Sequence, residues 1–419
     1  MNRCALRARY VFPVDAAPLE DAVVCVEGKR IVAVGENVFS TTPRALGQAA
    51  ILPGLVNAHA HLEFSDLDRP LGTRGMPLPD WIRLVIAHRS RRVPRLARPA
   101  VPSAAIARGL AECLAGGATT IGEIACGQFS DYASGARSAA VVALLEVIGF
   151  SGLRWQSALT AVLEKLDAPD APPQLAHGLC PHAPYTVHPE LVSRLAELSV
   201  QRKIPIAFHL AESPEELRLL RDGDGPFQEL LQERSMWDEG AIPRGSRPLD
   251  YLKRLAAAKH VLVIHGNYLD NEELELLAAQ RNRMSLIYCP RTHAYFDHQR
   301  YPLAKALALG VNVAVGTDSR ASNPDLSLWS ELRWLAAHHP DVRPHDLLAL
   351  GTRAGAVALG QGDAAGTLRP GNWANLTVVG LPQGRGEEPH ELLLDQVSRV
   401  REVWLRGQPV YSADAGQQR

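Results

Sequence analysis

The sequence predicts an α/β fold: a (β/α)8 TIM barrel with a small β-sandwich domain built from both chain termini. Two observations predict it. Eight short β-rich runs alternate with long helical patterns through the middle of the 419-residue chain. Both ends of the chain instead show alternating strand patterns. We therefore expect residues 1–50 and 366–419 to form the sandwich and residues 51–365 to form the barrel.

The two terminal segments share the same strand-rich texture. "DAVVCVEGKRIVAVGE" places a glycine between two valine-rich runs, which is typical of a hairpin. Near the other end, "GTLRPGNWANLTVVG" and "VREVWLRGQPVYSA" alternate in a similar way. The simplest interpretation is one small domain into which the barrel is inserted.

The expected barrel strands are 51–61, 118–124, 153–159, 174–180, 204–210, 260–266, 284–290 and 311–318. Helical patterns such as "AAIARGLAECLAGG", "PELVSRLAELSVQRK" and "NEELELLAAQRN" separate them. Two insertions, 66–100 and 213–250, follow the first and fifth strands. Both are expected to rise from the face of the barrel that carries active sites, as substrate loops or as decoration.

Composition excludes several classes of partner. The net charge of -1 and the lack of a long basic block argue against nucleic acid or an anionic membrane surface. No run approaches the roughly 20 apolar residues of a membrane span, and the N-terminus lacks the apolar core of a signal peptide. The six cysteines form no CxxC pair, which favours reduced thiols and a cytoplasmic protein.

Polar residues end five of the eight expected strands or follow directly after them, and His182 follows the fourth. His59 and His61 end the first, and their spacing points both imidazoles to one side of the strand. His209 ends the fifth strand, His265 the sixth and Asp318 the eighth. Each of these residues alone could have a structural role instead, since a single histidine at a strand end is more often a hydrogen-bonded structural residue. Together they predict one site at the barrel mouth.

Three imidazoles and a carboxylate suit a catalytic Zn²⁺ or Fe²⁺ that keeps one position for water. We assign His59, His61, His209 and Asp318 as ligands of one divalent metal, Zn²⁺ before Fe²⁺, and place His265 beside the metal. Such a metal lowers the pKa of its water from about 16 to near 7. Hydrolysis is therefore the expected chemistry.

The motifs "PGLVNAHAHLE", "PHAPYT", "FHLAE", "VIHG" and "VGTDSRASN" resemble the amidohydrolase superfamily in order and over nearly the whole chain. The stretch "GTLRPGNWANL" also fits, with Asn375 where the family usually has aspartate. Binuclear members bridge two metals with a lysine at the fourth strand. Because "QLAHGLCPH" holds no lysine, the resemblance implies a single metal.

Glu212, three residues after His209, resembles the cytosine/adenosine deaminase and chlorohydrolase-like branch. This implies a mononuclear aminohydrolase that releases ammonia from an aminopurine nucleoside-like or other heteroaromatic amine. Glu212 would carry a proton from water to a ring nitrogen, His265 would orient the water, and Asp318 would help to deprotonate it. Glu212 can also be read as an acid at the start of the next helix.

Other functions stay open. A related hydrolase could act on another leaving group, such as chloride of an s-triazine or the C–N bond of a cyclic amidine. A non-catalytic binding module would have lost a ligand or Glu212, and none is lost. The "HLEF" motif and Trp81 resemble the aminodeoxyfutalosine deaminases, which gives the preferred substrate type. The expected partners are a small-molecule substrate and water, and family habit suggests a homodimer.

Six residues are expected to contact the substrate. His182 follows from the family resemblance, while Glu63 and Trp81 come from the segments next to the metal pair. Arg154 could meet a carboxylate of the substrate or lie at the surface. Ser319 and Asn323, just past Asp318, are plausible floor residues of the site or plain turn formers.

Overall fold

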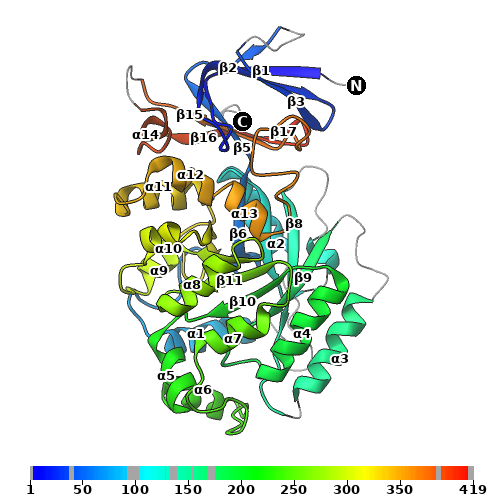
Figure 1. The fold of residues 1–419 in the computed structure, drawn as a ribbon, viewed down its shortest axis with the longest axis vertical. Helices are drawn as coiled ribbons and strands as arrows, with labels where there is room; N and C mark the ends of the chain where they lie inside the picture. Colours follow the sequence, from blue (N-terminus) through cyan, green and yellow to red (C-terminus); the bar gives the residue numbers. More distant parts are fainter. Residues whose placement is uncertain are drawn as a thin grey trace.

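The computed structural model describes residues 3–36, 42–91, 103–127, 129–132, 139–152, 154–167, 175–383 and 388–413. A smaller sheet formed by both termini lies at one end of the molecule and a barrel lies below it (Figure 1). Residues 92–100 of the insertion expected at 66–100 lie outside the described residues. Within the described ranges, no helix is both long enough and apolar enough to cross a membrane.

The middle of the chain forms the predicted barrel of parallel strands. The eighth strand consists of two segments, of which β13 pairs with β12 and β14 pairs with the first barrel strand, β6, so that the ring closes. Helices cover the outside, and the strands are therefore apolar and buried on both faces. The barrel strands are β6 (Leu55–His61), β7 (Ala118–Ala125), β8 (Ala140–Val147), β9 (Ala176–Pro181), β10 (Ile206–Leu210), β11 (Val261–His265), β12 (Met284–Tyr288), β13 (Asn312–Val315) and β14 (Asp318–Ser319).

The third predicted strand is wrong. Of the residues 153–159 expected to form it, 153 lies outside the described residues, and 154–159 belong to a helix, α3 (Arg154–Leu166). Its apolar residues Trp155, Leu159 and Val162 recur at helical spacing and pack against the core. The third strand is instead β8, whose continuous apolar run "AVVALLEV" suits a strand buried on both faces.

The helices that cover the barrel include those predicted from the three quoted helical patterns. Short 3-10 turns follow β6 and β7 at Leu62–Phe64 and Phe129–Tyr132. Besides α3, the helices around the ring are α2 (Ser103–Ala115), α4 (Pro189–Arg202), α7 (Pro248–Leu255), α8 (Asn271–Ala279), α9 (Pro290–Tyr295), α10 (Leu303–Leu309), α11 (Leu328–His338), α12 (Pro344–Leu350) and α13 (Arg353–Ala358).

Strands from both ends of the chain form one mixed sheet that curls around its own apolar core. The N-terminal and C-terminal strands meet where β15 pairs antiparallel with β5. The chain crosses from this sheet to the barrel at Gly54, so β5 extends past residue 50; the domain boundaries stay a prediction. The sheet contains β1 (Arg3–Val11), β2 (Leu19–Glu27), β3 (Arg30–Gly35), β4 (Arg44–Ala45), β5 (Ala49–Pro53), β15 (Leu376–Gly380), β16 (Arg399–Leu405) and β17 (Gln408–Ser412), and α14 (Pro389–Leu393) lies beside it.

The two insertions meet over the barrel mouth. The first contributes α1 (Leu78–Arg91), and the second contributes α5 (Pro214–Asp222) and α6 (Pro226–Glu233). These helices lie at the end of the molecule opposite the terminal sheet (Figure 1). The Arg83 guanidinium joins α1 to α6 by two hydrogen bonds to the Glu233 carboxylate, at 2.9 and 2.7 Å. This ion pair holds together two segments that are far apart in the sequence.

Candidate active site

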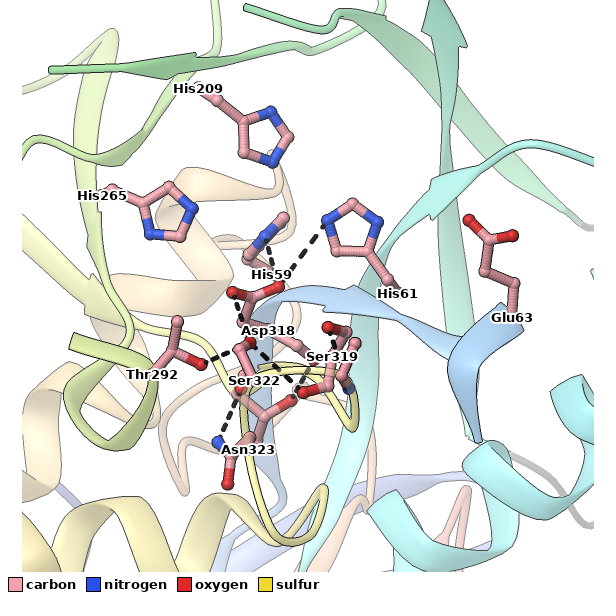
Figure 2. Close-up of polar contacts among 12 residues, drawn as sticks. His59, His61, Glu63, His209, His265, Thr292, Asp318, Ser319, Ser322 and Asn323 are labelled. Carbon is pink, nitrogen blue, oxygen red and sulfur yellow. Dashed lines mark hydrogen bonds and ion pairs between the residues drawn. The ribbon is translucent and has the colours of Figure 1, made fainter. Parts of the chain in front are cut away.

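The predicted metal ligands converge at the carboxyl ends of the barrel strands. Figure 2 shows the imidazoles of His59, His61, His209 and His265 gathered around the carboxylate of Asp318. Ligand atoms of His59, His61 and His209 lie within 4.8 Å of one another, as do those of His59, His265 and Asp318. All five residues are buried. The barrel topology therefore brings together side chains from its first, fifth, sixth and eighth strands.

Several imidazole nitrogens of this cluster make no hydrogen bond within the described part of the chain. They are both ring nitrogens of His59 and the Nδ1 of His61, and all three are buried. The Nδ1 of His209 lies 2.9 Å from the carbonyl oxygen of His182, which can only accept, so this nitrogen carries the proton. The Nε2 of His209 is therefore left as a lone-pair donor, which is the form that binds a metal.

Asp318 completes the cluster from the eighth strand. Its Oδ1 lies 3.6 Å from the Nε2 of His59 and 3.7 Å from the Nε2 of His61, while Ser322 donates a hydrogen bond to its Oδ2 at 3.1 Å. Burial alone would raise the pKa of Asp318, but the neighbouring imidazoles outweigh burial and lower it. Asp318 is thus a carboxylate. Its backbone is left-handed, with φ of 57°, as is that of His265 at 67°.

The cluster fits a divalent metal. Burial and the neighbouring His59 lower the pKa of His61 to about 3, so its ring is neutral at pH 7, as a metal ligand must be. Buried polar atoms without partners are rare in proteins, and His59, which belongs to both groups of ligand atoms, has two of them among the described residues. Neutral imidazoles with one carboxylate are a donor set that zinc and ferrous iron both accept.

Glu212 lies next to the ligand cluster, on the segment that follows β10. Its side chain is buried, with Oε1 3.4 Å from the Nε2 of His265. Burial raises the pKa of Glu212 well above its ordinary value, and the carboxylates of Asp318 and Glu216 add to this effect. A carboxyl group whose pKa is raised toward the working pH is suited to general acid–base catalysis.

Glu216 fixes the backbone that carries Glu212. Its carboxylate accepts hydrogen bonds from the amides of Ala211 and Glu212, at 2.7 and 3.1 Å. Ser213 caps α5 by accepting from the amide of Glu216. Glu216, not Glu212, is therefore the acid that binds the backbone at the start of α5. The side chain of Glu212 lines the cavity instead.

A cavity of about 260 Å³ opens beside the cluster. Residues of α1, and of α6 with the loop after it, form its apolar walls, so both insertions shape it. The lining combines the polar side chains His61, His182, His209, Glu212, His265 and Asp318 with the apolar side chains Leu78, Trp81, Ile82, Val85, Leu230 and Met236. An apolar pocket with a few convergent polar groups is the usual form of a small-molecule site.

Three of the expected substrate residues line this cavity: His182, Trp81 and Ser319. The ring of His182 is held by its Nδ1, 2.8 Å from the hydroxyl of Thr186. Trp81 is fixed by its indole N–H, which donates to the carbonyl of Ala321 at 3.1 Å. These three side chains are in place to contact a bound molecule.

The other three do not line it. Glu63 stands apart from the cluster (Figure 2) and pairs with Arg89. Arg154 is exposed on α3, because its segment is a helix rather than a barrel strand. Asn323 is buried, and its amide donates to Thr317 and Glu331, both at 2.7 Å. Asn323 therefore holds the loop after the eighth strand.

Glu146 and Arg89 line the cavity but were not predicted. Glu146 sits near the end of β8, and the strand wrongly placed at 153–159 concealed it. Burial alone would raise the pKa of Glu146, but Arg89, His182 and His61 lower it to about 2. The sequence did carry a signal, since Glu146 is a lone acid near the carboxyl end of an apolar run.

Comparisons with known proteins agree with this site. The chain is 28% identical to the 5-methylthioadenosine/S-adenosylhomocysteine deaminase of Pyrococcus furiosus, over 93% of this chain and 86% of that protein. It is 25% identical to the aminodeoxyfutalosine deaminase of a Nitratiruptor species, over 93% of this chain and 95% of that protein.

A solved structure has the same fold. The adenosine deaminase of Xanthomonas campestris, with bound zinc, superposes with a TM-score of 0.76 at 26% identity, over 97% of this chain and 92% of that one. The profile of the amidohydrolase family matches residues 50–410, which include the whole barrel and all the residues of the cluster. On this evidence the chain belongs to the amidohydrolase family.

Proposed function

We propose that this protein is a metal-dependent aminohydrolase, which replaces the amino group of an aminopurine nucleoside-like substrate or another heteroaromatic amine by oxygen and releases ammonia. The observation that carries this proposal is the buried Glu212 carboxyl beside His265 and the ligand cluster, at the wall of an apolar cavity. The deaminases named above support it. The metal would be one Zn²⁺, with Fe²⁺ suited to the same donors.

Different residues have different roles in the proposed reaction. His59, His61, His209 and Asp318 would hold the metal, which supplies a water of lowered pKa as the nucleophile.

Glu212 moves protons between the water, a ring nitrogen and the leaving amine, for which its raised pKa suits it. His265, 3.4 Å from Glu212, orients the water. His182 holds the ring from the neighbouring wall.

A finer proposal concerns the substrate. We favour an aminodeoxyfutalosine-type nucleoside, in keeping with the relative of that name. The cavity has largely apolar walls, and Arg234 in its lining can meet a carboxylate. The alternative is a related hydrolase with another leaving group, because the position of Glu212 does not depend on which group leaves. Action in the cytoplasm and a homodimer stay part of the proposal.

Ammonia release by zinc-loaded protein tests the activity. The substrate panel holds adenosine, S-adenosylhomocysteine, aminodeoxyfutalosine, guanine, cytosine and a chlorinated triazine. Turnover of the 6-aminopurine nucleosides alone supports the proposal. If the metal-loaded protein releases ammonia from none of the amines, the proposed reaction would have to involve a different leaving group.

Glu212→Gln tests the acid–base role. The variant is expected to keep its zinc and to lose about 10²- to 10⁴-fold in kcat. Glu197→Gln, on the exposed face of α4, is the matched control and is expected to behave as wild type. A Glu212→Gln rate near that of the control would refute the role of Glu212.

A further inference from the structure

Glu331 is a fully buried glutamate on α11 that has no role in the proposed reaction. Its Oε1 accepts from the Nε of Arg291 at 2.6 Å and from the side-chain amide of Asn323 at 2.7 Å. Its Oε2 accepts from the backbone amide of Arg291 at 3.0 Å. Replacing a buried ion pair by well-packed apolar side chains is often neutral or stabilising for a fold. Stability alone therefore does not explain a charge at this position of α11.

One set of these bonds holds the backbone that leads into Asp318. The side-chain amide of Asn323, which donates to Glu331, also donates to the carbonyl oxygen of Thr317 at 2.7 Å. Thr317 directly precedes Asp318, whose backbone is left-handed with φ of 57°. This conformation is unfavourable for a residue with a side chain and persists only where surrounding contacts impose it. The bond from Asn323 is such a contact, and Glu331 fixes the side chain that makes it.

The other set holds the carboxylate of Asp318 through α9. Glu331 binds both the amide and the guanidinium of Arg291, at the start of this helix. The next residue, Thr292, has its Oγ1 3.0 Å from the hydroxyl of Ser322, and Ser322 donates to the Oδ2 of Asp318 at 3.1 Å. Figure 2 shows these last two bonds. The backbone and the side chain of Asp318 are thus both connected to one buried carboxylate.

A second acid makes it possible to change Glu331 without leaving Arg291 unpaired. The carboxylate of Asp325 accepts from the Nη1 and Nη2 of Arg291 at 2.9 and 2.6 Å. Glutamine at position 331 would place an NH₂ group, which cannot accept, against Arg291 or Asn323. Glu331→Gln is therefore expected to fold, because Asp325 still balances the buried cation, and to lose bonds on the path to Asp318.

We propose that Glu331 is a positioning residue, which directs the carboxylate of Asp318 at the metal through Asn323 on one side and through α9 on the other. The inference rests on the part of the proposed function that makes Asp318 a metal ligand. Removing a group that orients a metal ligand typically costs about 10- to 100-fold in metal affinity. Glu331 is therefore expected to control zinc binding although it lies outside the ligand cluster.

Zinc affinity, measured by competition with a chelator, tests this role in Glu331→Gln and in Asp318→Asn. The matched control is Glu273→Gln, because Glu273 is also buried and accepts from the amides of Leu249 and Asp270 at the start of α8. Glu331→Gln is expected to bind zinc about 10- to 100-fold more weakly than wild type. Glu273→Gln is expected to stay within about threefold of wild type, even if thermal unfolding shows a loss of stability.

A zinc affinity of Glu331→Gln within about threefold of that of Glu273→Gln would overturn the inference, since both losses would then reflect stability alone. If Asp318→Asn binds zinc as tightly as wild type, Asp318 is not a ligand, and the inference falls with that assignment. No readout here needs a substrate. A zinc-loaded wild type that releases no ammonia would thus refute the proposed activity and leave the role of Glu331 standing.

Hydrogen exchange in wild type carries the test if Glu331→Gln does not fold. The amide of Arg291 donates to Glu331, and that of Leu249 donates to Glu273. Zinc is expected to slow exchange at Arg291 by about tenfold more than at Leu249, because metal bound to Asp318 stabilises the bonds that hold it. Equal slowing at the two amides would overturn the inference.

Discussion

Gly316 lies where the eighth barrel strand passes His59, and its replacement by alanine is expected to displace this proposed metal ligand. A Cβ atom at residue 316 would lie 2.7 Å from the Cβ of His59, 2.9 Å from its carbonyl oxygen and 3.0 Å from its nitrogen. Carbon atoms in contact prefer about 3.5–4.0 Å. The backbone at His59 therefore has to move by roughly 1 Å.

This movement changes the position of the His59 imidazole in the ligand cluster, because the packing around His59 leaves no space to absorb it. Its side chain is fully buried, and its carbonyl accepts a hydrogen bond from the amide of Thr317 at 3.0 Å. Crowding a packed core costs about 1–3 kcal/mol, and a catalytic group misplaced by about 1 Å can lose roughly 100-fold in rate. We expect Gly316→Ala to fold, to bind zinc more weakly and to have a kcat about 100-fold lower.

Competition with a chelator measures the zinc affinity, ammonia release measures kcat, and circular dichroism checks the fold. Gly240→Ala is the matched control, because its new Cβ would meet only the Oδ1 of Asp238, at an ordinary distance of 3.7 Å. If Gly316→Ala binds zinc as tightly as the Gly240→Ala control and keeps kcat within about threefold of it, the steric argument is refuted.

Two further substitutions probe the same site. His209→Ala is expected to lose zinc and activity together, since its free Nε2 faces the cluster; metal analysis after dialysis checks this, and full zinc occupancy would contradict the assignment. Glu216→Gln is expected to keep zinc but to lose about tenfold in kcat, because an amide can accept from only one of the Ala211 and Glu212 amides. An unchanged kcat would mean that Glu212 is held by other contacts.

The ligand cluster was predictable because each of its members ends a barrel strand. The ends of parallel strands in a barrel meet at one mouth, so residues such as His59 and Asp318 had to converge once the strands were identified. The third strand was missed because a continuous apolar run such as 140–147 has no alternation to identify it. Glu146 was lost with that strand.

The walls of the cavity were harder to predict. The helices α1 and α6 belong to insertions, so the repeating βα pattern of the barrel does not fix their positions. Long-range contacts hold them in place, such as the one between Arg83 and Glu233. The sequence could therefore suggest that Trp81 lies near the site, but it could not show that Arg154 lies outside the cavity. Recognition of the substrate depends on this part of the molecule.

The barrel is closed by a pair of side chains from its two ends, and this has a consequence for how the protein folds. The amide of Asn57 donates to the hydroxyl of Thr317 at 2.8 Å, across 260 positions of sequence. Contacts of such high contact order form late, because a long loop must close before they stabilise anything. Until then the histidines of the cluster lack the carboxylate of Asp318. Metal uptake should therefore report the last step of folding, and metal bound to the finished ring would oppose its reopening.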